Sequence, residues 1–288
     1  MVARHRALYQ RFLPEPKTRA FVWKYSQPIG GRRPRHFHDE PELNIVVQGW
    51  AKFGVGDRIV RVSRGELLAF PSGQDHELLE SSADLYLYAI GLDAAYAAEV
   101  LGTGQAELAP LHVRLSESEC AAVFERAAEL VDCPAAEQRG AELWHRIHWL
   151  GRRSAERLGR PTHVLTRRAL ARMAHAPELG LDALAQELRV HPSELSRQFH
   201  RNMGVTLVRH RARLRVLELI RLVDAGERDL MMAASAAGFG SYSQCHRTFR
   251  AELGCSPRQF FHSDVRQRMQ HAYADHAAQA EDGARVSG

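Results

Sequence analysis

The 288-residue sequence has few cysteines, almost no lysine and no long apolar run. No stretch of about eighteen apolar residues is present, which argues against a membrane-spanning helix. No apolar run follows the basic residues of Met1–Arg6, so a signal peptide is not expected. The cysteines show neither zinc-finger nor Cys-x-x-Cys spacing; they are Cys120, Cys133, Cys245 and Cys255. These absences predict a cytoplasmic protein with free thiols, and a redox pair between Cys120 and Cys133 is the open alternative.

Positive charge is concentrated in the C-terminal part of the chain. Residues 161–270 hold 17 basic and 10 acidic side chains, a net charge of +7, whereas residues 1–160 hold 21 of each sign. Because the only lysines are Lys17, Lys24 and Lys52, this charge is carried by arginine. The chain length suggests two domains. An excess of positive charge on one of them is what binding to nucleic-acid phosphates requires.

Residues 181 to 204 predict two short helices joined by a tight break. Apolar side chains follow helical spacing over 181–188. Pro192 disfavours helix at His191 and suits the first turn of a new helix, which ends near Gly204. The spacing turns Leu195, Phe199 and Met203 inward. The outward-facing side chains of this helix are Ser193, Ser196, Arg197 and His200.

The same plan recurs about fifty residues later. Residues 230–237 predict a short alanine-rich helix, 238–240 a glycine-containing turn, and 241–253 a second helix. Its buried face carries Cys245, Phe249 and Leu253, and its outward-facing side chains are Tyr242, Ser243, His246 and Arg247. Between the two units, residues 205–223 predict one helix with a strongly basic outer face.

The second unit contains the runs GFGSYS (238–243), FR (249–250) and GCSP (254–257), and this pattern resembles the signature of the AraC/XylS family of bacterial transcription regulators. The resemblance covers roughly residues 165–265. It implies binding to double-stranded promoter DNA, with RNA polymerase as a partner. The second helix of each pair, 192–204 and 241–253, would be the reading helix that enters a DNA groove. By position, the eight outward-facing side chains of the two reading helices would meet base edges or phosphates. The alternative is a tandem helical bundle that binds no DNA.

The N-terminal part changes to a strand pattern. From Phe21 to about Ile90, short β-rich runs alternate with glycine and proline, which favours an all-β barrel or sandwich. The runs are 43–47, 51–55, 58–62, 67–70 and 85–90. We therefore expect a two-domain α+β protein, with an N-terminal β-barrel and a C-terminal all-α domain.

Two motifs inside this β region carry candidate metal ligands. The pattern G-x5-H-x-H-x3-E-x6-G runs from Gly30 to Gly49, and G-x5-P-x-G-x2-H runs from Gly65 to His76. They resemble the two motifs of cupins, which are small double-sheet (jelly-roll) barrels. The second cupin motif usually ends in asparagine, whereas Glu80 stands at that position here. The resemblance implies four ligands: His36, His38, Glu42 and His76.

The spacing explains how such a site would form. His36 and His38 are two residues apart, so on a strand their side chains point to the same face. Glu42 joins that face if the strand stays regular, and His76 is expected from a facing strand. Three imidazoles and a carboxylate suit Fe, Mn, Co, Ni or Zn. The alternative is that the histidines line a pocket for an organic effector. Partners for the other ring nitrogens would be Asp39, Glu40 or Asp75.

A helical segment separates the two domains. Ser116 and Glu119 predict a capping box at the start of one helix. A second helix is expected over about 136–158. The family resemblance implies that this pair joins two subunits into a homodimer; the alternative is that it packs on its own barrel. We expect domains at 1–112, 113–160 and 161–270, and a disordered tail at 271–288.

Together these patterns predict a one-component regulator, more often an activator in the resembled family, whose barrel binds a small effector or a metal and thereby changes promoter binding. Two alternatives stay open. One is a cupin oxygenase or isomerase fused to a DNA-binding domain, although no acid–base partner is evident beyond the ligands. The other is a sensor in which the metal itself is the signal, or detects oxygen or a redox change.

Overall fold

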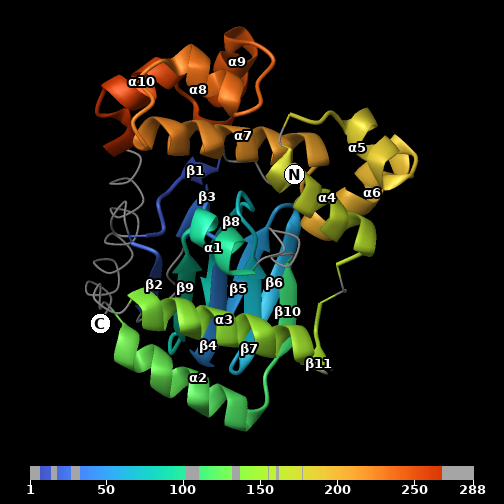
Figure 1. Cartoon of the computed structure of the whole chain (residues 1–288). Helices are drawn as coiled ribbons and strands as arrows, with labels where there is room; N and C mark the ends of the chain where they lie inside the picture. The colour runs from blue at the N-terminus through green and yellow to red at the C-terminus, as the bar shows by residue number, and fades with distance from the viewer. Residues whose placement is uncertain are drawn as a thin grey trace.

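The computed structural model contains a two-sheet sandwich at one end and two helical bundles at the other (Figure 1). Gly30, Cys133 and the expected tail 271–288 lie outside the residues that it describes. The residues that the structure describes are 7–13, 18–26, 33–101, 110–131, 137–154, 156–159, 162–176 and 178–267. No helix within these ranges has both the length and the apolar character needed to cross a lipid bilayer.

The strands form two stacked sheets. The smaller sheet has the order β1-β3-β8-β5-β6; in chain order its strands are β1 (Leu8–Tyr9), β3 (Arg33–Phe37), β5 (Trp50–Val55), β6 (Arg58–Ser63) and β8 (His76–Ser81). The larger sheet has the order β11-β10-β7-β4-β9-β2. Its strands are β2 (Ala20–Ser26), β4 (Glu42–Gln48), β7 (Glu66–Phe70), β9 (Tyr86–Leu92), β10 (Leu111–Arg114) and β11 (Glu156–Arg157). The predicted strands and the α+β class are confirmed.

Alternation of side chains along the larger sheet builds two cores. On β7, Leu68 and Phe70 face the smaller sheet, whereas Leu67 and Ala69 face a layer of helices. That layer consists of α2 (Glu117–Leu130) and α3 (Glu137–Arg153), which cover the outer face of the sheet (Figure 1). A further short helix, α1 (Ala94–Leu101), follows β9.

The capping box predicted at the start of the helical pair is present. The Ser116 side chain accepts the Glu119 backbone N–H, and the Glu119 carboxylate accepts the Ser116 N–H at 2.8 Å. The second helix of the pair is shorter than predicted, because α3 ends at Arg153 and the chain then forms β11. Trp144 and Ile147 of α3 are fully buried against the sheet.

The helical part consists of two bundles joined by one long helix (Figure 1). The first bundle contains α4 (Val164–His175), α5 (Leu181–Leu188) and α6 (Pro192–Met203). The second contains α8 (Leu230–Ala236), α9 (Tyr242–Leu253) and α10 (Pro257–His262). The long helix α7 (Leu207–Asp224) contributes to both cores. Both predicted helix pairs are confirmed, whereas α4 and α10 were not anticipated.

The sandwich and the helical part touch directly. The turn between β5 and β6 meets the turn between α6 and α7, where the Asp57 N–H donates to the Gly204 carbonyl at 2.9 Å. Gly56 and Gly204 both have positive φ, and a Cβ at Gly56 would lie 2.4 Å from the Gly204 oxygen. Only glycine permits this approach of two backbones. Tyr9 and Phe37 of the smaller sheet also belong to the core of the second helical bundle.

Candidate functional site

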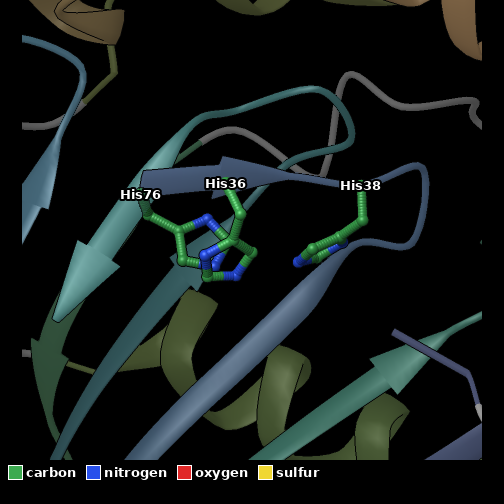
Figure 2. A group of neighbouring side chains, drawn as sticks. All are labelled: His36, His38 and His76. Carbon is green, nitrogen blue, oxygen red and sulfur yellow. The ribbon is translucent and has the colours of Figure 1, made fainter. Parts of the chain in front are cut away.

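Three histidine side chains converge at the end of the sandwich nearest α7 (Figure 2). His36 lies on β3, His38 directly follows that strand, and His76 opens β8. His36 and His76 are register partners on adjacent strands of one sheet. The expectation that His76 comes from a facing strand is therefore wrong. The jelly-roll connection, which returns β8 beside β3, brings the two residues together.

Glu42 joins the cluster by a different route from the one predicted. The strand that holds His36 ends at Phe37, and after a short connection Glu42 opens β4 in the other sheet. Its Oε2 atom lies 2.9 Å from Nε2 of His38 and 3.2 Å from Nε2 of His76. The carboxylate thus faces the histidines across the sandwich, and strand regularity plays no part in its placement.

Backbone carbonyls orient all three imidazoles. Nδ1 of His36 lies 2.9 Å from the Pro34 oxygen. Nδ1 of His38 lies 2.7 Å from the Glu40 oxygen, and Nδ1 of His76 lies 3.1 Å from the Gln74 oxygen. Because a carbonyl only accepts, each Nδ1 carries a proton, and whichever ring is neutral then has its lone pair on Nε2. This is the tautomer that a metal-binding imidazole needs.

The side chains proposed as partners for these nitrogens lie elsewhere. The Glu40 carboxylate is 3.7 Å from Nδ1 of His38, beyond hydrogen-bonding distance. Asp39 accepts a hydrogen bond from Ser72 at 2.9 Å. Asp75 pairs with two arginines instead. The second motif's Glu80 is exposed and pairs with Lys52 at 2.6 Å, so it takes no part in the cluster.

Burial and charge set opposing protonation preferences in the cluster. Burial, reinforced by the charges of His76 and His38, holds the pKa of His36 well below its usual value. Burial also disfavours a charged His38, but the hydrogen bond and the charge of Glu42 outweigh it and raise that pKa. Burial alone would raise the pKa of Glu42, yet the neighbouring His76 and His38 hold it well below its usual value. The Glu42 carboxylate, which can only accept, lies between the Nε2 atoms of His38 and His76, so a proton is needed between these groups. A metal cation would fit at the position of that proton.

The surroundings of the cluster are apolar and closed to solvent. His36, His38 and His76 are 5%, 3% and 3% exposed. The Phe70 ring stacks on His76 with 4.1 Å between centroids, and Phe12 lies 5.5 Å from His38. One nitrogen from each histidine lies within 4.8 Å of the others, and this set of three does not include Glu42. Such a group has the donor set and spacing of a three-imidazole site for a divalent transition metal.

The two predicted reading helices share one construction. Each begins at a side-chain cap, His191 for α6 and Ser241 for α9. Each ends at a glycine with positive φ, Gly204 at 64° and Gly254 at 84°. Phe199 and Phe249, at equivalent positions, are fully buried. Each helix therefore keeps one face packed in its bundle and turns the opposite face outward.

The outward residues predicted from the sequence fall into three groups. Ser193, Arg197, Ser243 and Arg247 are exposed, whereas Ser196 and His246 are half-buried beside them. Tyr242 is half-buried and packs on the core of its own bundle. His200 is exposed but lies 3.3 Å from the carboxylate of Asp57 in the sandwich.

The basic outer face predicted for the linking helix is only partly outward. On α7, Arg213 is fully buried and Arg215 is 6% exposed. Arg213 pairs with Asp75 of the sandwich at 2.6 Å and with Glu252 of α9 at 3.1 Å. The helix faces the sandwich on the side that the charge pattern assigned to solvent. Sequence reasoning missed this contact, which links segments 138 residues apart.

Comparison with known protein families agrees with both halves of this structure. Residues 25–150 match the profile of the AraC-like ligand binding domain, and residues 184–263 match a helix-turn-helix domain. The first match covers the sandwich and the helical pair, and the second covers both reading helices. The chain belongs to the AraC family of transcription regulators.

Curated relatives match this chain over most of their length. The HTH-type transcriptional activator RhaS of Salmonella agona is 26% identical over 255 residues, which is 81% of this chain and 87% of that protein. The same protein of Salmonella typhimurium has the same identity and coverage. Among solved structures, ToxT from Vibrio cholerae is 12% identical, with a TM-score of 0.44, and the match covers 84% of this chain and 95% of ToxT.

This AraC-family member is a ligand-responsive DNA-binding regulator with an N-terminal sensor of cupin type. Its curated relatives bear the name of a transcriptional activator. One polar residue of the sensor site escaped the sequence analysis: Asn44 donates to Glu42 Oε1 at 2.7 Å and is 2% exposed. The signal was available, because residues two apart on a strand share a face.

Proposed function

We propose that this regulator binds a divalent transition metal in its sensor domain through His36, His38 and His76, with Glu42 as the adjacent carboxylate. The observation that carries the proposal is the orientation of the rings, since each Nδ1 faces a backbone carbonyl, so that Nε2 is the nitrogen that would coordinate a metal. Zinc, iron, manganese, nickel or cobalt suits this donor set. When bound, the metal would supply a fixed positive charge and open coordination positions for a small effector.

The first test is the metal content of the protein, measured by elemental analysis after purification without a chelator or a metal-affinity tag. We expect close to one metal per chain in the parent protein and none in the His36→Ala/His38→Ala double variant. A matched control is His163→Ala, which removes a histidine outside the cluster. No metal in the parent protein, even after reconstitution, would reduce the three histidines to the lining of an organic-effector pocket.

Metal affinity is also expected to depend on pH. A metal ion would displace the proton that Glu42 and the imidazoles share, so binding releases protons and weakens as the pH falls. Cobalt(II) titrations followed by visible absorption measure this dependence directly. An affinity that stays constant while the buffer is acidified through the usual histidine range would argue against imidazole ligands.

We further propose that the DNA-binding domain spans 161–270 and contacts promoter DNA with the outward faces of α6 and α9. The contacting side chains would be Ser193, Ser196, Arg197, His200, Tyr242, Ser243, His246 and Arg247. Support comes from the exposed or half-buried positions of these side chains and from the +7 charge of the domain. Selection from a randomised duplex pool, followed by footprinting at modest salt, tests this assignment. Failure to recover any preferred sequence would contradict it.

We propose that the protein works as an activator, in contact with RNA polymerase, and as a homodimer. The curated relatives bear the name transcriptional activator. The dimer contact is assigned to the 113–160 segment, next to the sensor at 1–112, because α3 leaves Trp149 56% exposed. Sedimentation velocity on Trp149→Glu and on the control Trp23→Glu tests it. Loss of dimer in the first variant alone is the expected result; a monomeric parent protein would overturn it.

A further inference from the structure

One buried guanidinium connects the sensor domain with the second reading helix. Arg213 on α7 is 0% exposed. Its Nη1 donates to Asp75 Oδ1 at 2.6 Å, and its Nε donates to Glu252 Oε2 at 3.1 Å. Asp75 belongs to the sandwich and Glu252 to α9, so a single side chain bridges three elements. In Figure 1, α7 lies between the sandwich and the second bundle.

On the sensor side, the bridge ends beside the histidine cluster. Asp75 directly precedes His76, and the Gly73 N–H of the same turn donates to the His38 carbonyl at 2.9 Å. Arg35 holds the other Asp75 oxygen at 2.6 Å. Gly73 has φ of 72°, and a Cβ there would lie 3.3 Å from Leu214. The turn that carries Asp75 is therefore held against α7 and against the backbone of one histidine, and it leads directly into another.

On the DNA side, the bridge reaches only one of the two reading helices. Glu252 of α9 is held by Arg213 and by Arg209, both on α7. The equivalent position of α6 is Asn202, whose side chain accepts from the His163 N–H at 3.0 Å and the Thr166 hydroxyl at 2.8 Å. Those residues belong to the first bundle. The sensor thus has a buried ionic connection to α9 and none of this kind to α6 among the described residues.

The contact around Arg213 is imperfectly satisfied. Within the described part of the chain, both ring nitrogens of His210, Nη2 of Arg213 and Oε1 of Gln74 are buried without a hydrogen-bond partner. Burial, with the neighbouring charge of Arg213, lowers the pKa of His210 to about 3. Buried polar groups in a permanent core are nearly always paired. Four such atoms therefore lie around the Arg213 contact, where the sandwich meets α7.

We propose that Arg213 is a positioning residue through which the sensor sets the second reading helix, and that occupancy of the histidine cluster changes this setting by moving the Asp75 turn. The inference rests on the proposed metal site for its input. Through the bridge, a metal ion would bind with different affinity to two arrangements of α9, one with the Asp75–Arg213–Glu252 contacts in place and one with them altered. Linkage between the metal site and the DNA site requires such a difference in affinity. The first reading helix would respond less.

Hydrogen–deuterium exchange on the full-length protein, with and without cobalt(II), tests the bridge. We expect cobalt to change the exchange of α9 amides in the parent protein by about fivefold or more. In Arg213→Met, cobalt still binds but the α9 response disappears. Arg172→Met, which removes an exposed pair with Glu187 in the first bundle, keeps the full response. A residue with a purely structural role would change the baseline exchange and leave the cobalt response in place.

Visible absorption of cobalt on the same samples distinguishes a failure of the bridge from a failure of the proposed metal site. Cobalt bands with no α9 response in the parent protein would overturn the bridge alone. Absence of cobalt bands in the parent protein would overturn the metal site and the bridge together. If Arg213→Met does not fold, Asp75→Asn replaces it, because the amide oxygen still accepts from Arg213 while the charge is lost. A reduced α9 response in Asp75→Asn supports the bridge, and an unchanged response contradicts it.

Discussion

The two helix-turn-helix units bury their reading helices in the same way but differ in the contacts at the end of each helix. Residues 191–204 and 241–254 have nearly the same sequence of buried and exposed positions, and each reading helix ends in a left-handed glycine. The exposed faces are alike because the same bundle geometry buries the opposite face. The side chains that hold the far end of each helix differ, since Asn202 bonds within its own bundle and Glu252 bonds to α7.

Two units of the same fold therefore differ in how they are connected to the rest of the chain. A neutral amide can satisfy its hydrogen bonds locally, whereas a buried carboxylate requires a cation. The cation here is Arg213, which also pairs with Asp75 of the sensor. The first unit contacts the sandwich through the Gly204 carbonyl and through the exposed pair of His200 with Asp57. The second unit is joined to the sandwich by a buried ionic bridge.

The largest effect is expected where the buried charges meet. Arg213→Met leaves Asp75 and Glu252 without their shared partner, which costs about 3–5 kcal/mol. Asn202→Ala removes neutral hydrogen bonds and costs about 1–3 kcal/mol. Urea unfolding of the full chain, monitored by circular dichroism, gives both values. Equal losses in the two variants would show that the ionic bridge adds nothing to an ordinary polar contact.

Next in size are the effects on DNA affinity. If Arg197 and Arg247 read bases, replacing either by alanine weakens binding to the selected sequence by about 1–3 kcal/mol. Fluorescence anisotropy on the selected and a scrambled duplex, at several salt concentrations, measures this. An equal loss on both duplexes would make the arginine a phosphate contact. A loss for one arginine only would show that the two units do not read DNA alike.

A smaller effect is expected at the turn inside each unit. Arg189 and Gly238 occupy the same position, and both have positive φ, 57° and 83°. A non-glycine residue in this conformation is strained by about 1–2 kcal/mol. Arg189→Gly should therefore stabilise the first unit by about 0.5–1 kcal/mol after the entropic cost of glycine, and Gly238→Ala should destabilise the second. Thermal unfolding midpoints that move in the same direction in both variants would refute this reasoning.

The smallest effect concerns the helix caps. The Ser241 hydroxyl accepts the Gln244 N–H at 3.2 Å, and Nδ1 of His191 accepts the Ser193 N–H at 3.3 Å. Ser241→Ala should cost about 0.5–1 kcal/mol, whereas His191→Ser should gain a few tenths, because serine is the better cap. Amide exchange at the first turn of each helix reports the change. A destabilised His191→Ser variant would show that the imidazole contributes more than a cap.

The helical half was predictable because its signals are local. Pro192 and the glycines mark turns, and the apolar spacing marks buried faces, so both helix pairs follow from nearby residues. The motif also singled out His36, His38, Glu42 and His76, the four side chains that the structure brings together. Their arrangement was not predicted, because the position of β8 beside β3 is a property of the sheet topology. The burial of Arg213, on the helix predicted to have a basic outer face, was missed for the same reason: its partners Asp75 and Glu252 lie far away in the sequence.

The backbone contact between Gly56 and Gly204 has a consequence for how this protein can change. Neither residue has a side chain, so the docking of the two domains at that point leaves no chemical group that a substitution could remove. It can only be obstructed. A single methyl group at position 56 would act as a wedge 2.4 Å from the Gly204 oxygen, without altering a histidine of the cluster or a residue on the outward face of a reading helix. One carbon atom would then suffice to force apart the two backbones at this contact.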